Sequence, residues 1–290
     1  MKVRLIANPA SAKGKGVRLI DRALSSLSRH GITPQISITT HPGHARSLAE
    51  DALGSFEAIA GLGGDGTMNE IASAIKHTGR PLAVYPAGTG NDFIKCLGNG
   101  ITYDSVSGAL AQMNTSYIDM AMVNGRDMIN ILGIGFDAIV AEKNSRIKGM
   151  GGMASYAWAL LRSLGKFRHY PLELHINGED IRANALFLSI GNGPVCGGGF
   201  RLTPGALPDD GLLDVTLISD LPLRAVPLHI HKAFNGKIAG TPYTRTFRAQ
   251  RLSISSTSPL PSHIDGEVLE PYVDRYDIEV LPGALSVVRP

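Results

Sequence analysis

The residues best placed to do chemistry lie in a glycine-rich turn, Gly61-Leu62-Gly63-Gly64-Asp65-Gly66-Thr67-Met68-Asn69-Glu70. The apolar run over residues 57–61 predicts a buried strand before the turn, and the apolar spacing over residues 68–75 predicts a helix after it. Thr67 and Glu70, three residues apart, fit a capping box at the start of that helix. Such a turn directs backbone amides and the positive end of the helix dipole outward, so it predicts a phosphate-binding site.

The same glycines could belong to another kind of phosphate-binding motif, and the sequence allows two such motifs to be checked. Gly61, Gly63 and Gly66 satisfy G-x-G-x-x-G, but the dinucleotide fold also needs an acid about 20 residues further on, and residues 84–88 contain none. The chain also lacks the G-x-x-x-x-G-K-[ST] run of a P-loop. A tight turn that binds nothing is the remaining alternative. Asp65 argues against it, because an acid in a phosphate loop is costly unless it orders the turn or binds a metal.

Composition narrows the class of protein. The 290 residues suffice for two domains, and 43% hydrophobic with 18% charged residues is globular. The net charge of +3 suits an anionic membrane surface or a nucleotide and is too weak to indicate nucleic acid. Cys96 and Cys196 have no C-x-x-C spacing, which favours a reducing compartment. Without a signal peptide or an apolar run of roughly 18 residues, we expect a cytoplasmic protein that is peripheral at the membrane.

Strands and helices alternate through the first part of the chain. This pattern predicts a doubly wound α/β nucleotide-binding domain over residues 1–117, which residues 283–290 could complete. Its expected strands cover residues 3–7, 35–39, 57–61 and 81–85, and its expected helices include residues 17–29 and 44–53.

Polar or glycine-rich residues follow each of these strands. Asn8, Thr40, the turn over residues 63–69 and Thr89 all come just after a predicted strand end. Because the carboxyl ends of parallel strands share one edge of a sheet, we expect these segments to converge on one ligand site.

The pattern of predicted elements changes after residue 117, where short strands and hairpin turns predict an antiparallel β-sandwich domain over residues 118–282. The expected turns are Asn124-Gly125, Asn177-Gly178, Asp210-Gly211 and Asp265-Gly266. The expected strands cover residues 117–123, 128–132, 171–176, 183–190, 213–218, 250–255, 263–270 and 276–280, and the expected helices residues 137–147, 152–164 and 222–234.

Taken together, these motifs resemble the soluble diacylglycerol kinase family of lipid kinases, whose eukaryotic relatives include sphingosine kinases. The Gly-Gly-Asp-Gly-Thr segment is shared with NAD kinases and phosphofructokinases, whereas Gly-Thr-x-Asn-Asp-Phe and the downstream Asp-Gly-Glu make the resemblance specific. The matching segments, in order, are Asn8-Pro9, Gly63 to Asn69, Pro86 to Phe93, Gly135-Phe136-Asp137-Ala138, Lys148-Gly149, Gly197 to Phe200, Asp210 to Val215 and Asp265-Gly266-Glu267.

The resemblance implies an ATP-dependent kinase that acts on a lipid hydroxyl. By position, the predicted nucleotide-binding residues are Asn8, Thr40, Gly63, Gly64, Asp65, Gly66, Thr67, Met68, Asn69 and Thr89. Asp265 and Glu267 would supply the catalytic base. A structural Mg²⁺ would lie at Asp210, with backbone carbonyls from Leu207 and Leu212.

The residues are compatible with this chemistry, because phosphoryl transfer depends mainly on positioning and charge stabilisation, and one carboxylate suffices as base. The sequence does not choose between Asp265 and Glu267. Asp265-Gly266 and Asp210-Gly211 could also be plain turns, and His263 could only fill a strand position. His229 and His231 are assigned no ligand role.

We therefore expect a kinase that transfers phosphate from Mg-ATP to diacylglycerol or a similar lipid alcohol. The alternatives are an NAD-kinase-like small-molecule kinase and a non-catalytic nucleotide sensor. The expected partners are the lipid substrate and an anionic membrane surface, with no nucleic acid, and exposed strand edges could pair in a homodimer.

Overall fold

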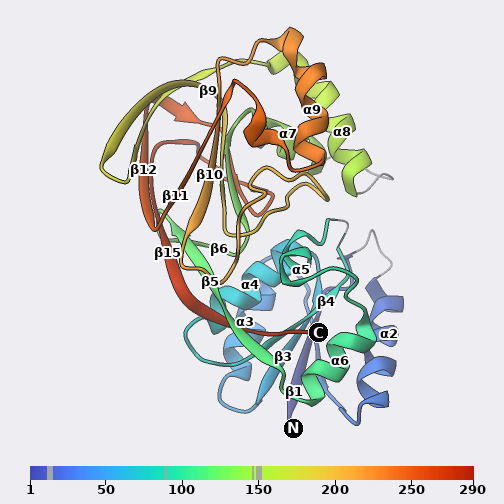
Figure 1. Cartoon of the computed structure of the whole chain (residues 1–290). Coiled ribbons are helices and arrows are strands. Elements are labelled where there is room, and N and C mark those ends of the chain that lie inside the picture. The colour runs from blue at the N-terminus through green and yellow to red at the C-terminus, as the bar shows by residue number, and fades with distance from the viewer. Residues whose placement is uncertain (12–15, 89, 146, 148–151) are drawn as a thin grey trace. The chain divides into compact units, whose positions relative to one another are not determined.

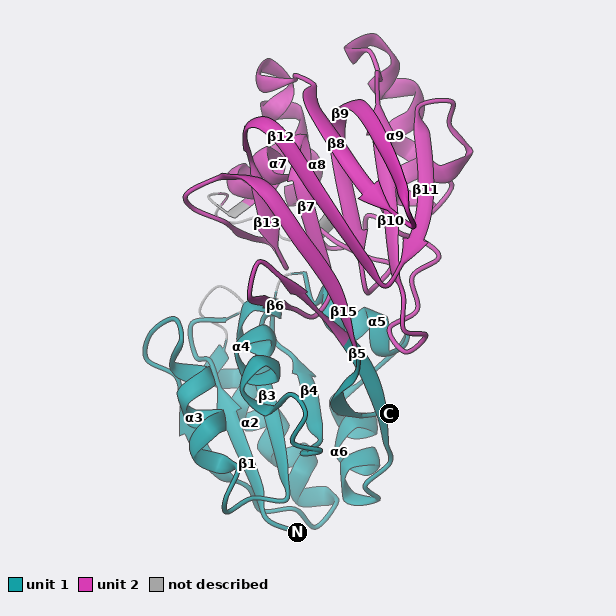
Figure 2. Cartoon of the chain, turned by 90° about the vertical axis from the view of Figure 1, so that its left-hand side faces the viewer, with its two compact units in different colours: residues 1–119, 282–290 teal, residues 120–281 magenta. Residues whose placement is uncertain are grey.

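The structure is a computed structural model that describes residues 1–11, 16–88, 90–145, 147 and 152–290. The chain divides into two compact units (Figure 2). Unit 1 comprises residues 1–119 and 282–290, and unit 2 comprises residues 120–281.

Unit 1 is built on a parallel sheet with the strand order β2-β1-β3-β4-β15 (Figure 1). The strands are β1 (Val3–Ala7), β2 (Gln35–Ile38), β3 (Ala58–Gly63), β4 (Leu82–Pro86) and the end of β15 (Val273–Val288). The helices are α2 (Gly16–Arg29), α3 (His44–Ala52), α4 (Asp65–Ile75), α5 (Asp92–Leu97) and α6 (Tyr103–Ala111). Every residue of β3 is buried, as expected for a strand covered on both faces. The predicted α/β architecture is confirmed.

Unit 2 is mainly antiparallel, with the path β14-β13-β7-β9-β8-β12-β15, while β10 pairs with β9 and β11, and β5 pairs with β6 and β15. Its strands are β5 (Thr115–Val123), β6 (Arg126–Met128), β7 (Ile131–Gly135), β8 (Tyr170–Ile176), β9 (Glu179–Gly191), β10 (Leu213–Ser219), β11 (Thr244–Ala249), β12 (Arg251–Leu260), β13 (Ser262–Ile264) and β14 (Glu267–Val268). Its helices are α7 (Phe136–Ser145), α8 (Gly152–Ser163) and α9 (Val226–Phe234), with short 3₁₀ turns at Leu164–Lys166, Leu223–Ala225 and Ile238–Gly240. The predicted β-sandwich-like second part is confirmed.

Several elements of unit 2 differ from expectation. β11 was not predicted, because its residues are mostly polar and it pairs on one side only, with β10. The strand expected over residues 276–280 continues into the segment expected to complete the first domain, so that both form one continuous strand, β15. Asp210-Gly211 is not a hairpin turn but the end of the long loop before β10. The other three predicted turns have both residues in the left-handed region, as two-residue hairpin turns require.

The predicted capping box at the start of α4 is wrong. The N-cap is Gly64, which has no side chain to accept a hydrogen bond. Glu70 instead reaches the start of α3, where its two carboxylate oxygens accept hydrogen bonds from Gly43 N (2.8 Å) and Ala45 N (3.0 Å). This acid satisfies amides at the α3 N-terminus, whose own N-cap, Gly43, cannot do so.

Within the described ranges, every helix is too short or too polar to serve as a bilayer span.

Glu70→Ala should lower the free energy of unfolding by about 1–2 kcal/mol, because two amides at a helix start lose their acceptor. Glu50→Ala is the matched control, since the ion pair of Glu50 within the described structure is an exposed one with Arg46, which contributes about 0.3–0.5 kcal/mol. Urea unfolding followed by circular dichroism measures both variants. Equal losses would contradict the capping role of Glu70.

Candidate functional site

The ends of β1 and β3 in unit 1 are joined by side-chain contacts. Asn8, directly after β1, donates from Nδ2 to the hydroxyl of Thr67 (3.1 Å). Its own amide donates to the carbonyl of Leu62 in β3 (2.8 Å). The glycine turn and the segment after β1 therefore meet at one edge of the sheet, as predicted from the strand order.

The segment after β4 joins them through a close backbone contact. A Cβ atom on Gly88 would lie 2.7 Å from the Cα atom of Gly64, closer than real side chains pack. The amide of Ala87 donates to the carbonyl of Gly63 (3.1 Å). Gly63 is equally constrained, because a Cβ atom there would lie 2.6 Å from Cβ of Thr67. The glycines of both turns thus permit an approach that no other residue allows.

Asp65 bonds to the segment after β4, whereas the roles expected for it were to order its own turn or to bind a metal. Its Oδ1 atom accepts a hydrogen bond from the amide of Phe93 in the first turn of α5 (3.0 Å). Asn91 also holds the segment after β4: its Oδ1 atom accepts from Gly88 N (2.7 Å), and its φ of 51° is left-handed. Asn91 was not among the predicted site residues, although asparagine is common at such positions.

The other predicted nucleotide residues have different environments. Gly66 follows Asp65 in the first turn of α4, whereas the side chain of Met68 is buried against Gly61. Oδ1 of Asn69 accepts from the hydroxyl of Ser73 (3.4 Å). Thr40 is exposed at the end of β2, with its hydroxyl 3.0 Å from Nδ1 of His44. Thr89 lies outside the described residues, so its role stays a prediction.

Unit 2 contains the two predicted catalytic acids in contrasting surroundings. Asp265 accepts three backbone hydrogen bonds: Oδ1 accepts from Asn130 N (3.0 Å) and Ile131 N (2.8 Å), and Oδ2 accepts from Ile129 N (3.0 Å). These bonds explain why the strand expected over residues 128–132 is split between β6 and β7. Glu267, two residues later on β14, is exposed.

The predicted magnesium site contains an arginine. Asp210 accepts a hydrogen bond from Leu212 N on Oδ1 (3.1 Å), and its Oδ2 is paired with the guanidinium of Arg248. The same guanidinium bonds Oδ2 of Asp214 (3.2 Å). Burial raises the pKa of the Asp214 carboxyl, and Arg248 opposes this effect. No cluster of three or more histidine, cysteine or acidic side chains that could hold a metal occurs in the described part of the chain.

The two carboxylates of Asp210 and Asp214 attract a cation, and in this structure that cation is the guanidinium of Arg248 on β11. A Mg²⁺ ion held by Asp210 and the carbonyls of Leu207 and Leu212 would have to displace the guanidinium. The sequence did not indicate Arg248, because Arg248 lies on β11, and β11 was not predicted as a strand owing to its polar residues.

Unit 2 also contains an apolar pocket between helices α7, α8 and α9 and the sheet. Its walls include Phe136, Val140, Tyr156, Leu160, Ile230 and Ala233. Among the described residues that line it, Asp137 is the one carboxylate. A hydrocarbon group would fit such walls, because apolar surface gains from leaving water.

Two protein families match the chain. The diacylglycerol kinase catalytic domain matches residues 2–123. The YegS C-terminal NAD kinase beta sandwich-like domain matches residues 130–289.

Relatives match over almost the whole chain. A Yersinia enterocolitica protein named "Probable lipid kinase YegS-like" is 30% identical over 99% of this chain and 96% of its own length. A Pseudomonas fluorescens protein of the same name is 31% identical over 100% and 95%. A Mycobacterium tuberculosis protein named "Diacylglycerol kinase" is 28% identical over 100% and 95%.

A crystal structure of a diacylglycerol kinase from Bacillus anthracis has the same fold. It superposes with a TM-score of 0.76 at 21% identity and covers 100% of this chain and 97% of that chain. The domain matches and the relatives confirm the family that the sequence motifs indicated. The chain belongs to the diacylglycerol kinase and YegS-like family of lipid kinases.

Proposed function

We propose that the protein is an ATP-dependent lipid kinase that transfers the γ-phosphate to the hydroxyl of diacylglycerol or a similar lipid alcohol. Family membership supports the kinase class. The observation that carries the proposal in this chain is the pair of glycine turns, at Gly63-Gly64 and Gly88, held against each other at the carboxyl edge of the unit 1 sheet.

ATP is proposed to bind at this edge. The amides at the N-terminus of α4 carry partial positive charge and would hold phosphate oxygens. Thr40 and Thr89 would donate hydrogen bonds, while Asn8 and Asp65 keep the segments in place. Mg²⁺ bound with ATP would neutralise charge that develops on the phosphate oxygens.

Glu267 is the proposed base. The carboxylate of Asp265 already accepts hydrogen bonds from three backbone amides, so its oxygens hold the turn in place. Glu267, two residues later, is exposed. Its carboxylate would take the proton of the lipid hydroxyl as that oxygen attacks the γ-phosphorus. The bond from the γ-phosphorus to the β–γ bridging oxygen breaks, and ADP leaves with the electron pair.

The apolar pocket of unit 2 is the proposed site for a hydrocarbon chain of the lipid. Burial of each methylene group contributes about 0.8 kcal/mol. A lipid alcohol therefore suits this unit better than a polar acceptor such as NAD, which would leave the pocket walls unused.

Radioactive ATP and vesicles that contain diacylglycerol test the activity. Glu267→Gln should lower kcat by about 10²–10⁴-fold, the usual contribution of a general base, with ATP affinity unchanged. Asp265→Asn is the comparison: it should lower thermal stability as well as kcat, because the turn loses acceptor strength. No labelled product from diacylglycerol or any other lipid alcohol would overturn the proposal, and label on NAD would favour a small-molecule kinase.

The cation at Asp210 can be tested separately from turnover. Arg248→Met leaves Asp210 and Asp214 without a positive partner, so the unfolding temperature should fall by about 2–4 °C, as expected for a loss of ~1 kcal/mol. Added Mg²⁺ should reverse the fall. Arg245→Met is the control, because Arg245 lies on the same strand and its guanidinium lies over the Phe247 ring. Equal stabilisation of wild type and Arg248→Met by Mg²⁺ would show that the metal displaces the arginine.

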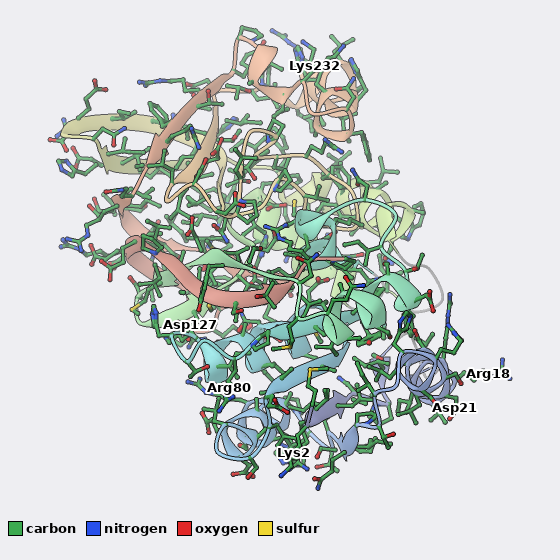
Figure 3. All side chains as sticks on the ribbon, turned by 60° about the horizontal axis from the view of Figure 1, so that its bottom comes forward. Lys2, Arg18, Asp21, Arg80, Asp127 and Lys232 are labelled. Atoms are coloured by element: carbon green, nitrogen blue, oxygen red, sulfur yellow. The ribbon has the colours of Figure 1, made fainter. Side chains whose placement is uncertain are left out.

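Membrane contact is proposed through α8 and α9, which also line the pocket. Residues 152–172 and 221–240 contain no Asp or Glu. Among the described side chains of these segments, four large apolar ones are exposed: Trp158, Leu161, Leu223 and Leu228. The six basic residues of the same segments are Arg162, Lys166, Arg168, Arg224, Lys232 and Lys237. Figure 3 shows Lys232 at the outer side of α9. Each cation near an anionic surface contributes about 1 kcal/mol.

Trp158 is the single tryptophan, so its fluorescence reports this contact directly. Phosphatidylglycerol vesicles should shift its emission to shorter wavelength, and pure phosphatidylcholine vesicles should do so less. Leu161→Gln with Leu228→Gln should weaken binding to the vesicles. Ile36→Gln, an exposed apolar residue of unit 1, should leave binding unchanged. An emission spectrum that anionic vesicles do not move would contradict the proposed face.

A further inference from the structure

Three buried side chains of unit 2 form a hydrogen-bonded chain that the proposed mechanism does not use. The Tyr156 hydroxyl on α8 donates to Oδ1 of Asp137 on α7. Nε2 of His263 on β13 lies 3.1 Å from Oδ2 of the same carboxylate. Their exposed fractions are 6%, 5% and 3%.

The chain ends on the turn that carries the proposed base. The amide of Gly266 donates to Nδ1 of His263 (3.2 Å). Because Nδ1 accepts, the ring proton lies on Nε2, which donates to Asp137. Both nitrogens of this imidazole are therefore committed, one to the carboxylate and one to the turn.

The space around the pair fixes its position. On β7, a Cβ atom at Gly133 would lie 2.3 Å from Nε2 of His263 and 2.4 Å from Oδ2 of Asp137. Only glycine leaves room for both groups at this point. The contact is part of the sheet, because Gly133 pairs with His263 in the β13–β7 register.

The turn is consequently held from two sides. Asp265 is anchored by the amides of residues 129–131, and Gly266 by His263. Asp265 is left-handed, with φ of 51°, a backbone form that is uncommon for residues other than glycine and that its three hydrogen bonds help to hold. Glu267 follows immediately, so the backbone position from which its carboxylate extends depends on these two anchors.

A purely structural role explains poorly why the buried side chains of Asp137, His263 and Tyr156 are polar. Burial of a carboxylate costs several kcal/mol before its partners compensate, and apolar residues of the same size often fill such a space equally well. Because the space adjoins the apolar pocket, apolar side chains would find neighbours there.

We propose that His263, Asp137 and Tyr156 are positioning residues for the phosphoryl transfer. They hold Gly266 so that Glu267 keeps its orientation, and Tyr156 ties that turn to the wall of the lipid pocket. The inference rests on the proposed role of Glu267 as base. Misplacement of a reacting group by about 1 Å can lower a rate by roughly 10²-fold.

Two substitutions of one histidine separate its two hydrogen bonds. His263→Asn keeps an oxygen near the place of Nδ1 for Gly266 but is too short to reach Asp137. His263→Gln reaches Asp137 but leaves the Gly266 amide without its acceptor. We expect kcat to fall about 10²-fold in His263→Gln and less in His263→Asn, with the KM for ATP unchanged in both.

Controls distinguish positioning from folding. His175→Gln alters an exposed histidine on β8 and should have wild-type kcat. Amide hydrogen exchange should be faster at Gly266 in His263→Gln than in His263→Asn. Tyr156→Phe removes one hydroxyl and keeps the ring, so it serves if the histidine variants do not fold; it should lower kcat several-fold and leave the KM for ATP unchanged.

The outcomes are separable. A wild-type enzyme that phosphorylates no lipid alcohol would overturn the proposed function and this inference together. An active wild type with wild-type kcat in folded His263→Gln, or in Tyr156→Phe when the histidine variants do not fold, would overturn the inference alone. So would a loss of kcat that matches the loss of folded protein.

Discussion

The contact between the backbones at Gly64 and Gly88 is the constraint on which the unit 1 site depends. Two turns that follow neighbouring strands can meet only because Gly88 has no Cβ atom. The amide of Ala87 and the carboxylate of Asp65 then fasten the turns to each other. The result is a rigid edge of backbone amides, which is what a polyphosphate requires, since preorganised donors cost no rearrangement when charge arrives.

Acidic side chains in both units fasten loops. Glu70 satisfies amides at the start of α3, Asp65 the amide of Phe93, and Asp265 three amides after β6. Each reaches across more than twenty residues of sequence, so each joins segments that local structure cannot join. A carboxylate has several acceptor positions and suits this task better than a neutral side chain. An acidic residue inside a motif is therefore not by itself evidence of a catalytic base, because its hydrogen bonds can instead hold the backbone of a loop in place.

The sequence predicted the parts of the fold that follow local rules. Buried apolar runs marked β1, β3 and β4, and Asn-Gly or Asp-Gly pairs marked three hairpin turns, because period and turn chemistry are read from adjacent residues. The predictions failed where the role of a residue depends on a partner that is distant in the sequence. Glu70 has the spacing of a capping box, but the residue that needs its oxygens is Gly43. Arg248 and β11 left no signal, because a polar edge strand resembles a loop until its partner is known. His263 does lie on a strand, as the sequence allowed, but the sequence did not indicate its hydrogen-bond contacts with Asp137 and with the turn.

The order of the segments in β15 has a consequence for synthesis. Residues 282–288 supply the last strand of the unit 1 sheet, next to β4, and Leu285 and Val287 are fully buried there. The ribosome makes these residues only after all of unit 2. The nascent unit 1 must therefore keep the edge of β4 unpaired while the intervening residues emerge, and it closes its sheet with a strand made about two hundred residues after β4. Unit 2 completes its fold from its own continuous segment, residues 120–281, so the part of the chain made first is the part that completes its fold last.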